Sequence, residues 1–461
     1  MNSGKTTAIK DFTQGNISSQ LMRFALPLFL SNLLQVVYNM VDMIIVGNTM
    51  GKVGISAVSV GGDVSHFLTF IAMGFGSAGQ VIIARYIGEK QKDKLSTFVG
   101  TMCSFLFCSA VIISVLGFVF RHQMLRLMST PEQAYEGALV YSVISMAGLV
   151  FIYGYNIVSA ILRGMGDARH PFIFISIAAV LNVVLDLLFV CVFQMGPGGA
   201  ALATVISQGV SFVACAIFLF KNKEKFELQF KAEEFLHWDK EMLSDLVKLG
   251  VPMAIKTASI QISRLFVNSW VNSYGIAVSA FAGIGNKVSN TANLISAALN
   301  TAGSTMVGQN IGAKNYGRVK KVMLELAKIT IPAATLVSLC FVFFPDQIFG
   351  IFTDEAEVLA IGRTYVPICI MLFYGSAMRC IMNALMNGSG NHSVNFATAI
   401  LDGFILRIGL SLLFGLYFDM KHIGFWLGDA LACFTPFFIG LAFYYSGRWK
   451  KENHGRGNET K

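Results

Sequence analysis

Long apolar stretches separated by short polar segments fill the chain from Gln20 to Ser446. A helix that crosses the hydrocarbon core of a bilayer needs roughly 20 mostly apolar residues. Twelve stretches approach or exceed that length, near residues 20–47, 55–84, 95–120, 136–162, 171–193, 199–220, 245–272, 279–308, 319–344, 358–386, 395–417 and 424–446. The pattern predicts an all-α polytopic membrane protein with twelve transmembrane helices, six in each half of the chain.

The composition supports this class and argues against several others. Hydrophobic residues make up 54% of the chain and charged residues 13%, about half the charged fraction of a typical soluble domain. The net charge is +9, but the basic residues form no continuous patch, so we expect no nucleic-acid partner. The eight cysteines lie in apolar stretches, where we expect them to be packing residues. No P-loop, HExxH or CxxC motif occurs, so we expect neither an enzyme nor a bound cofactor.

The basic residues orient the predicted helices. With the N-terminus inside, the outer side holds only Lys52, Arg121, Arg126, Arg363 and Lys421, whereas the segments on the inner side hold most of the Lys and Arg residues. Cytoplasmic loops carry the excess of positive charge in membrane proteins. We therefore expect a multi-pass protein of the cell inner (cytoplasmic) membrane with both termini in the cytoplasm.

The two halves resemble each other. GSAGQVIIARYIGEK (76–90) aligns with NTAGSTMVGQNIGAK (300–314), and LRGMGD (162–167) aligns with MNGSGN (386–391), with the same shift in numbering of 224 for both pairs (300 − 76 and 386 − 162). An even number of spans per repeat makes the repeats parallel, which predicts two six-helix bundles related by pseudo-two-fold symmetry about the membrane normal. Transporters have this architecture.

The repeat also predicts the domain boundaries. The N-terminal bundle covers residues 1–220, including a cytoplasmic tail over residues 1–19. A polar linker over residues 221–244, which we expect to form an amphipathic surface helix, separates it from the C-terminal bundle at 245–446. A second cytoplasmic tail covers residues 447–461. Pro27 in the first span answers Pro252 in the seventh, and we predict that Pro27 is a bend or hinge.

Polar residues at membrane depth mark a candidate site in the first bundle. Asp42 lies late in one outward-running span, and Asn182 and Asp186 lie one helical turn apart in another. Tyr141 and Thr204 lie early in inward-running spans, at a similar depth. Two carboxylates in a low dielectric share a proton or bind a cation, and a hard cation such as Na⁺ prefers oxygen ligands. We predict a cation-coupling site here; the alternative is that Asn182 and Asp186 only hydrogen-bond neighbouring helices.

The second bundle carries charge of the opposite sign. Basic residues lie within or near its spans at Lys256, Arg264, Lys287, Arg379 and Arg407, with Asp402 in the eleventh span. Some of these cations are expected to pair with Asp402, to reach the interface or to bind backbone carbonyls. The alternative is that Arg264 or Arg407 lines a substrate cavity. At a shift of 224, Leu410 matches Asp186, and we assign no role to Asp63 or Asp429.

The chain resembles the multidrug and toxic compound extrusion (MATE) family. The likeness covers essentially the whole chain and includes the LP…Q…Y…VD…VG pattern over residues 26–47, the LRGMGD loop and the N…D pair of the fifth span. It is closest to the DinF-like branch, since acids expected in spans 7 and 10 of NorM-like members do not occur between Gly250 and Asn272 or between Val358 and Leu401.

The resemblance implies a function. Members are secondary transporters that export organic cations by antiport with H⁺ or Na⁺ in an alternating-access cycle, and a monomer is expected. The resemblance implies a coupling site at the positions of Asp42, Tyr141, Asn182, Asp186 and Thr204, and it adds Gln35 and Asn156 as cavity residues. Possible Na⁺ ligands are Asp42, Asn182, Asp186 and Thr204.

Two other functions remain open at this point. A flippase for lipid-linked sugars belongs to the same superfamily, and the basic second half is compatible with one. A non-transporting receptor or scaffold is the alternative from another class, although acids at membrane depth in a duplicated bundle argue against it.

Overall fold

The computed structural model describes residues 7–128, 130–229 and 238–450, and all regular secondary structure in these ranges is helical. The N-terminal half contains α1 (Ile17–Gly88), α2 (Lys92–Val119), α3 (Arg121–Leu127), α4 (Glu132–Ala147), α5 (Leu149–Gly164), α6 (Arg169–Asp186), the π-helical turn η1 (Leu187–Val192) and α7 (Gly196–Lys221). The C-terminal half contains α8 (Lys240–Asn272), α9 (Ile276–Gly312), α10 (Tyr316–Phe343), α11 (Pro345–Gly350), α12 (Ala356–Gly388), α13 (His392–Ile400), η3 (Leu401–Leu406), α14 (Arg407–Leu412), η4 (Leu413–Tyr417), α15 (Lys421–Ala432), α16 (Thr435–Ser446) and η5 (Arg448–Lys450).

The described helices account for all twelve predicted spans. Eight helices or helix runs are long and apolar enough to cross a membrane, and the pair α4–α5, bent by 51°, makes a ninth. α1 has 72 residues, enough for two crossings, and is divided at Gly51, whose φ of 62° and ψ of −154° are not helical. α8 and α9 are long enough for one crossing each, although they are too polar to count among the eight. The predicted all-α polytopic fold is confirmed.

The chain forms two compact units. The first contains residues 26–254 together with 1–11, and the second contains residues 255–461 together with 12–25. α1 and α8 therefore contribute residues to both units. Each of them changes unit within three residues of its proline, Pro27 or Pro252.

The predicted bundle boundaries at residues 220 and 245 were drawn from the sequence repeat and remain predictions. The predicted linker helix over 221–244 includes residues 230–237, which lie outside the described ranges. The same holds for residues 1–6 and 451–461 of the two predicted tails.

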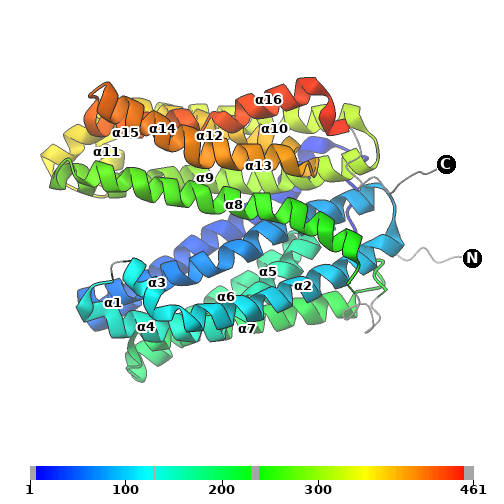
Figure 1. The fold of residues 1–461 in the computed structure, drawn as a ribbon, viewed down its shortest axis with the longest axis horizontal. Helices are drawn as coiled ribbons and strands as arrows, with labels where there is room; N and C mark the ends of the chain where they lie inside the picture. Colours follow the sequence, from blue (N-terminus) through cyan, green and yellow to red (C-terminus); the bar gives the residue numbers. More distant parts are fainter. Residues whose placement is uncertain (1–6, 129, 230–237, 451–461) are drawn as a thin grey trace, which may run out of the picture. The chain divides into compact units, whose positions relative to one another are not determined.

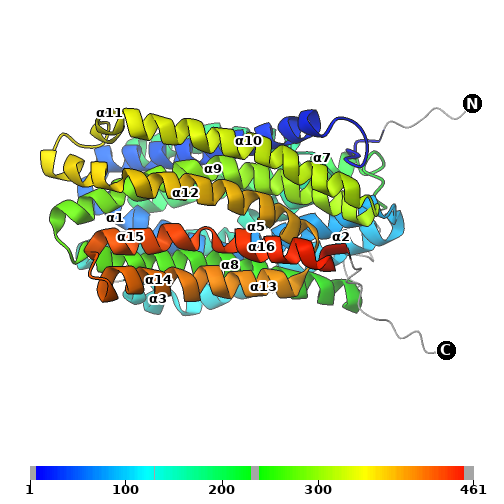
Figure 2. The ribbon, with the colours of Figure 1, turned by 90° about the horizontal axis from the view of Figure 1, so that it is seen from above.

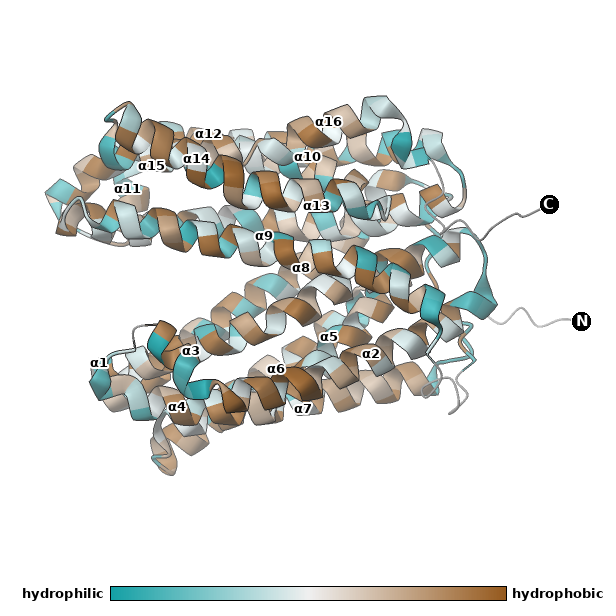
Figure 3. Cartoon of the chain, in the orientation of Figure 1, coloured by the Kyte–Doolittle hydropathy of each residue, from teal (hydrophilic) through white to brown (hydrophobic). Residues whose placement is uncertain are grey.

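Helix packing inside each unit is dense and apolar. In the first unit α7 packs against α4, α5 and α6, and α2 packs against α5 (Figure 1). The buried Tyr153 of α5 donates a hydrogen bond to Leu68 O of α1 at 2.7 Å. In the second unit α9, α10 and α12 lie side by side (Figure 2). Apolar residues cover these helices along most of their length (Figure 3), as a bilayer requires.

A close glycine contact recurs in the two units at the predicted shift of 224. A Cβ added to Gly164 would lie 2.9 Å from Gln80 O, and one added to Gly388 would lie 2.7 Å from Ser304 O. Both the glycines (388 − 164) and the carbonyls (304 − 80) differ by this shift. The duplicated sequence motifs therefore build the same backbone contact twice, and glycine is required because any side chain would displace the facing helix.

We expect Gly164→Ala and Gly388→Ala each to destabilise the protein by about 1–3 kcal/mol, the usual cost of forcing an atom into a packed interface. Gly283→Ala is a matched control, because a Cβ there meets no atom within 4 Å. The measurement is the apparent melting temperature of the purified protein in detergent. Equal melting temperatures for all three variants would contradict the close contact.

Candidate functional site

A cavity of about 360 Å³ lies within the first unit, between α1, α4, α5, α6 and α7. Five of the predicted site residues line it: Gln35 and Asp42 from α1, Tyr141 from α4, Asn156 from α5 and Thr204 from α7. Residues far apart in the sequence therefore line one shared space, as the depth comparison predicted for three of them. We refer to this space as the polar cavity.

The other two predicted residues, Asn182 and Asp186, lie on α6 next to this wall and do not line the polar cavity. Asn182 Nδ2 donates a hydrogen bond to Thr204 Oγ1 at 3.4 Å. Asp186 is completely buried and lies within electrostatic reach of Asp42 and Tyr141. We refer to Asp42, Tyr141, Asn182, Asp186 and Thr204 as the acid cluster.

The ring of Tyr141 packs closely against the backbone of α1, and this contact fixes its position. A Cβ on Gly61 would lie 2.5 Å from Tyr141 Cδ1, so the absence of a side chain at Gly61 makes room for the ring. The Tyr141 side chain is almost completely buried, at 7% exposure, and still reaches the cavity wall.

Four buried oxygens of the acid cluster accept no hydrogen bond from the described part of the chain. They are Asp42 Oδ1, Asn182 Oδ1 and both carboxylate oxygens of Asp186. A buried polar atom without a partner is costly, and a buried, unpaired carboxylate is more so. The donor set, consisting of carboxylate, amide and hydroxyl oxygens, suits a proton or a hard cation such as Na⁺.

The sequence analysis did not predict several residues that line the polar cavity. Tyr38 precedes Asp42 by four residues and Gln208 follows Thr204 by four, so each lies one helical turn from a predicted residue. A spacing of four residues on a helix, which puts two side chains on one face, is the signal by which both could have been found. Asp63 and His66, one turn apart on α1, also line the polar cavity and interact electrostatically. The exposed carboxylate of Asp63, which had no assigned role, thus lies on the wall of the site.

In the second unit Arg407 is held between two acids. Its side chain is completely buried and donates to Asp402 Oδ1 at 2.8 Å and to Asp429 Oδ1. Asp402 is also completely buried. Arg407 therefore pairs with Asp402, one of the alternatives that the sequence left open. Its second partner is Asp429, to which the sequence analysis assigned no role.

Arg264 lines a second, much smaller cavity of about 20 Å³ in the same unit, together with Asn268, Tyr365 and Asp429. That volume has room for about one water molecule. Arg264 also lies within electrostatic reach of Asp429, so it belongs to the surroundings of the Arg407 ion pair.

The repeat relates this ion pair to the acid cluster. Gly199 packs on Phe189 in the first unit and Gly424 packs on Phe414 in the second, which sets a shift of 225 in this region (424 − 199). At that shift Arg407 is the equivalent of Asn182, and Asp429 is the equivalent of Thr204. The match of Asp186 to Leu410 at a shift of 224 is therefore wrong, because the packing places Ser411 there.

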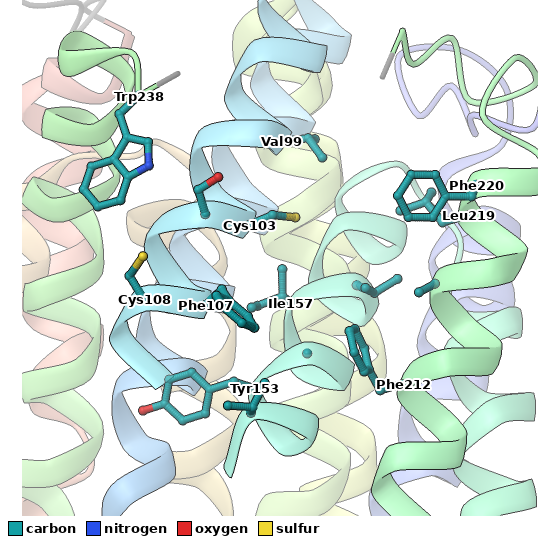
Figure 4. Close-up of a pocket in the computed structure, with 15 residues that line it drawn as sticks. Val99, Cys103, Phe107, Cys108, Tyr153, Ile157, Phe212, Leu219, Phe220 and Trp238 are labelled. Carbon is teal, nitrogen blue, oxygen red and sulfur yellow. The ribbon is translucent and has the colours of Figure 1, made fainter. Parts of the chain in front are cut away.

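A second cavity of the first unit has a mostly apolar wall. It measures about 440 Å³ and lies between α2, α5 and α7, where Phe107, Ile157 and Phe212 point into it (Figure 4). The hydroxyl of Tyr153 on its wall is already bonded to Leu68 O, and Ser104 Oγ donates to Gly100 O at 3.0 Å. This wall contains no charged side chain, and its two hydroxyls are already bonded to backbone carbonyls, so the polar cavity is the candidate site.

Comparisons with known proteins agree with this architecture. Two proteins of Bacillus subtilis (strain 168) are similar: the probable multidrug resistance protein YoeA is 31% identical, with 93% of each chain covered, and YpnP is 29% identical, with 95% of this chain and 97% of the relative covered. A solved structure of a MOP superfamily transporter from Pyrococcus furiosus matches the fold with a TM-score of 0.89 at 22% identity, covering 97% of this chain and all of that one.

The twelve spans, the internal repeat and the cavity define a polytopic helical membrane transporter. The model of the MatE family matches residues 27–188 and again residues 252–413, two segments that differ by a shift of 225 (252 − 27) and together span well over half of the chain. The chain belongs to the MatE family, and the resemblance to multidrug and toxic compound extrusion transporters is confirmed.

We expect Arg407→Met to destabilise the protein by about 3–5 kcal/mol, because it leaves the buried Asp402 and the partly buried Asp429 without their shared cation. The triple variant Arg407→Met, Asp402→Asn, Asp429→Asn removes the charges together and is expected to recover most of the loss. Apparent melting temperatures of both proteins check this. A triple variant as unstable as the single one would show that the size of Arg407, and not its charge, matters.

Proposed function

We propose that the chain is a secondary active multidrug efflux transporter that exports organic cations in exchange for H⁺ or Na⁺. The single observation that carries this proposal is the acid cluster beside the polar cavity, where four buried oxygens have no partner in the described chain. A site of this kind binds a small cation reversibly, because the oxygens gain a partner only while the cation is there.

The cavity wall supports an organic cation as the exported molecule. Asp63 offers an exposed carboxylate, and Tyr38 and Tyr155 offer aromatic rings on the same wall. Aromatic faces attract organic ammonium groups, and the thioethers of Met43 and Met73 adapt to varied shapes. In this proposal the buried carboxylates of Asp42 and Asp186 bind the coupling ion, and the exposed carboxylate of Asp63 binds the drug.

The proposed cycle uses these two sites in turn. Drug occupies the polar cavity while Asp42 and Asp186 lack a coupling ion. Entry of H⁺ or Na⁺ from outside neutralises the acid cluster, α1 rearranges near Pro27, and the drug is released outward. One-for-one exchange of monovalent cations moves no net charge, whereas one additional cation per cycle would add about 2.3 kcal/mol per 100 mV of membrane potential. The protein acts as a monomer in the cytoplasmic membrane, with both termini inside.

We expect Asp42→Asn and Asp186→Asn to abolish efflux of ethidium from cells, because an amide takes up no proton at neutral pH and has no negative charge with which to hold Na⁺. The measurement compares efflux with and without Na⁺ at matched membrane expression, and the sodium dependence of the wild type names the ion. Efflux at wild-type rates in both variants would contradict coupling at the acid cluster. A wild type that moves no cationic dye would contradict drug export and favour the lipid-linked sugar flippase.

We expect Asp63→Asn to raise the KM for ethidium about fivefold with little change in the maximal rate, since a partly exposed ion pair contributes about 1 kcal/mol. Glu132→Gln, at an exposed acid that does not line the polar cavity, is the matched control. Initial rates of efflux at several dye concentrations separate the two parameters. A lowered maximal rate with unchanged KM would place Asp63 in coupling instead of drug binding.

A further inference from the structure

Two basic side chains of the second unit have amide partners and no acidic ones. Lys256 Nζ of α8 donates to Asn383 Oδ1 at 2.7 Å, and Arg379 Nη2 of α12 donates to Asn293 Oδ1 at 2.9 Å. Neither cation takes part in any ion pair found among the described residues.

Both cations lie within membrane-spanning helices and near each other, with Arg379 nine residues before the end of α12 (388 − 379). Lys256 is the midpoint of α8, equally far from its two ends (256 − 240 and 272 − 256). It lies within electrostatic reach of Arg379, and both side chains are half-buried. Two like charges at this depth are costly unless an opposite charge joins them.

The acids of the second unit supply that charge only in part, because Asp402 and Asp429 are the two acids near four cations, Lys256, Arg264, Arg379 and Arg407. Asp402 lies within electrostatic reach of Lys256, but its Oδ1 is bonded to Arg407 at 2.8 Å. Asp429 is bonded to Arg407 as well. Between Val358 and Leu401 the sequence contains no acid at all. The neutral carbonyls of Asn383 and Asn293 orient the two cations without compensating them.

The repeat places Arg379 at a position that faces a binding cavity in the first unit. Gly164 and Gly388 fix a shift of 224 between α5 and α12, and at that shift Arg379 answers Tyr155. Tyr155 lines the polar cavity. The equivalent helix face in the second unit thus carries a guanidinium where the first unit carries a phenol.

We propose that Lys256 and Arg379 form an anion subsite that binds the carboxylate or phosphate group of an amphiphilic transported molecule. Lysine has three N–H donors and arginine has five, so the single bond that each makes to an asparagine leaves donors for an anion. A planar guanidinium matches the two oxygens of a carboxylate or phosphate. The proposal rests on the proposed transport function and extends its substrates from organic cations to amphiphiles that also carry an anionic group.

The test uses two dyes that differ in one group. Rhodamine 110 carries a free carboxylate, and rhodamine 123 is its methyl ester. Binding of each to the purified full-length protein is measured by fluorescence polarisation for the wild type and for Lys256→Gln with Arg379→Gln. We expect the double variant to lose roughly tenfold to a hundredfold in affinity for rhodamine 110, as for hydrogen bonds to charged groups. Affinity for rhodamine 123 is expected to change less than about twofold, within the context-dependent range of an exposed contact.

Two further variants keep the result interpretable. The charge-preserving variant Lys256→Arg with Arg379→Lys is expected to retain the preference for rhodamine 110. Lys287→Gln, at a basic residue that lies over the Phe352 ring, is the matched control and should leave both affinities unchanged. An equal loss for both dyes, or no loss for rhodamine 110, would overturn the anion subsite. The proposed efflux function is judged separately, by ethidium export in cells.

A competition arm identifies the source of the anion. Rhodamine 110 binding is repeated in micelles containing phosphatidic acid or the phosphate-free diacylglycerol. If phosphatidic acid displaces rhodamine 110 and diacylglycerol does not, and if the double glutamine variant shows no such displacement, the subsite is supported and its anion is a lipid phosphate. No displacement by either lipid, together with the dye preference above, would support the subsite and assign it the carboxylate of a soluble amphiphile.

Discussion

The cost of an ionised side chain at membrane depth governs this molecule. Removing a charge from water into a low dielectric costs several kcal/mol unless a counter-charge and hydrogen bonds compensate it. At Arg407 the second unit compensates this cost permanently, because the guanidinium lies between Asp402 and Asp429. The first unit leaves it unmet within the described chain, since both oxygens of Asp186 have no partner. The fixed guanidinium of Arg407 stabilises the fold, whereas the unpaired carboxylate of Asp186 can be paired by a cation that enters and leaves.

One duplicated scaffold supports both solutions. The contact of Gly164 with Gln80 O returns as that of Gly388 with Ser304 O, so the backbone packing is shared while the side chains differ. At equivalent positions the first unit has Asn182 and the second has Arg407. Because glycine contacts hold the helices together, a charge can change at a neighbouring position without a change of fold.

Much of this organisation could be predicted from the sequence. Apolar stretches report helix length directly, so all twelve spans were found, and the constant shift between motifs revealed the repeat. The side-chain pairings were harder to predict. Asp402 lies five residues before Arg407 on the same helical run, so pairing with Asp402 could be expected from the sequence, whereas Asp429 comes within reach only after α14 and α15 have packed. Asp63 was missed for the same reason, since one acid in an apolar stretch carries no sign of the cavity it faces.

Volume alone does not identify the site either. The apolar cavity, at about 440 Å³, is similar in volume to the polar cavity, at about 360 Å³, yet its hydroxyls are already bonded to backbone carbonyls. A ligand shifts a conformational equilibrium only by the difference in its affinity for the two states. An exchange site therefore needs atoms that gain a partner when the ion arrives and lose it when the ion leaves. In the first unit the oxygens of Asp42, Asn182 and Asp186 meet that condition, whereas the Asp402 and Asp429 oxygens bonded to Arg407 already have their partner.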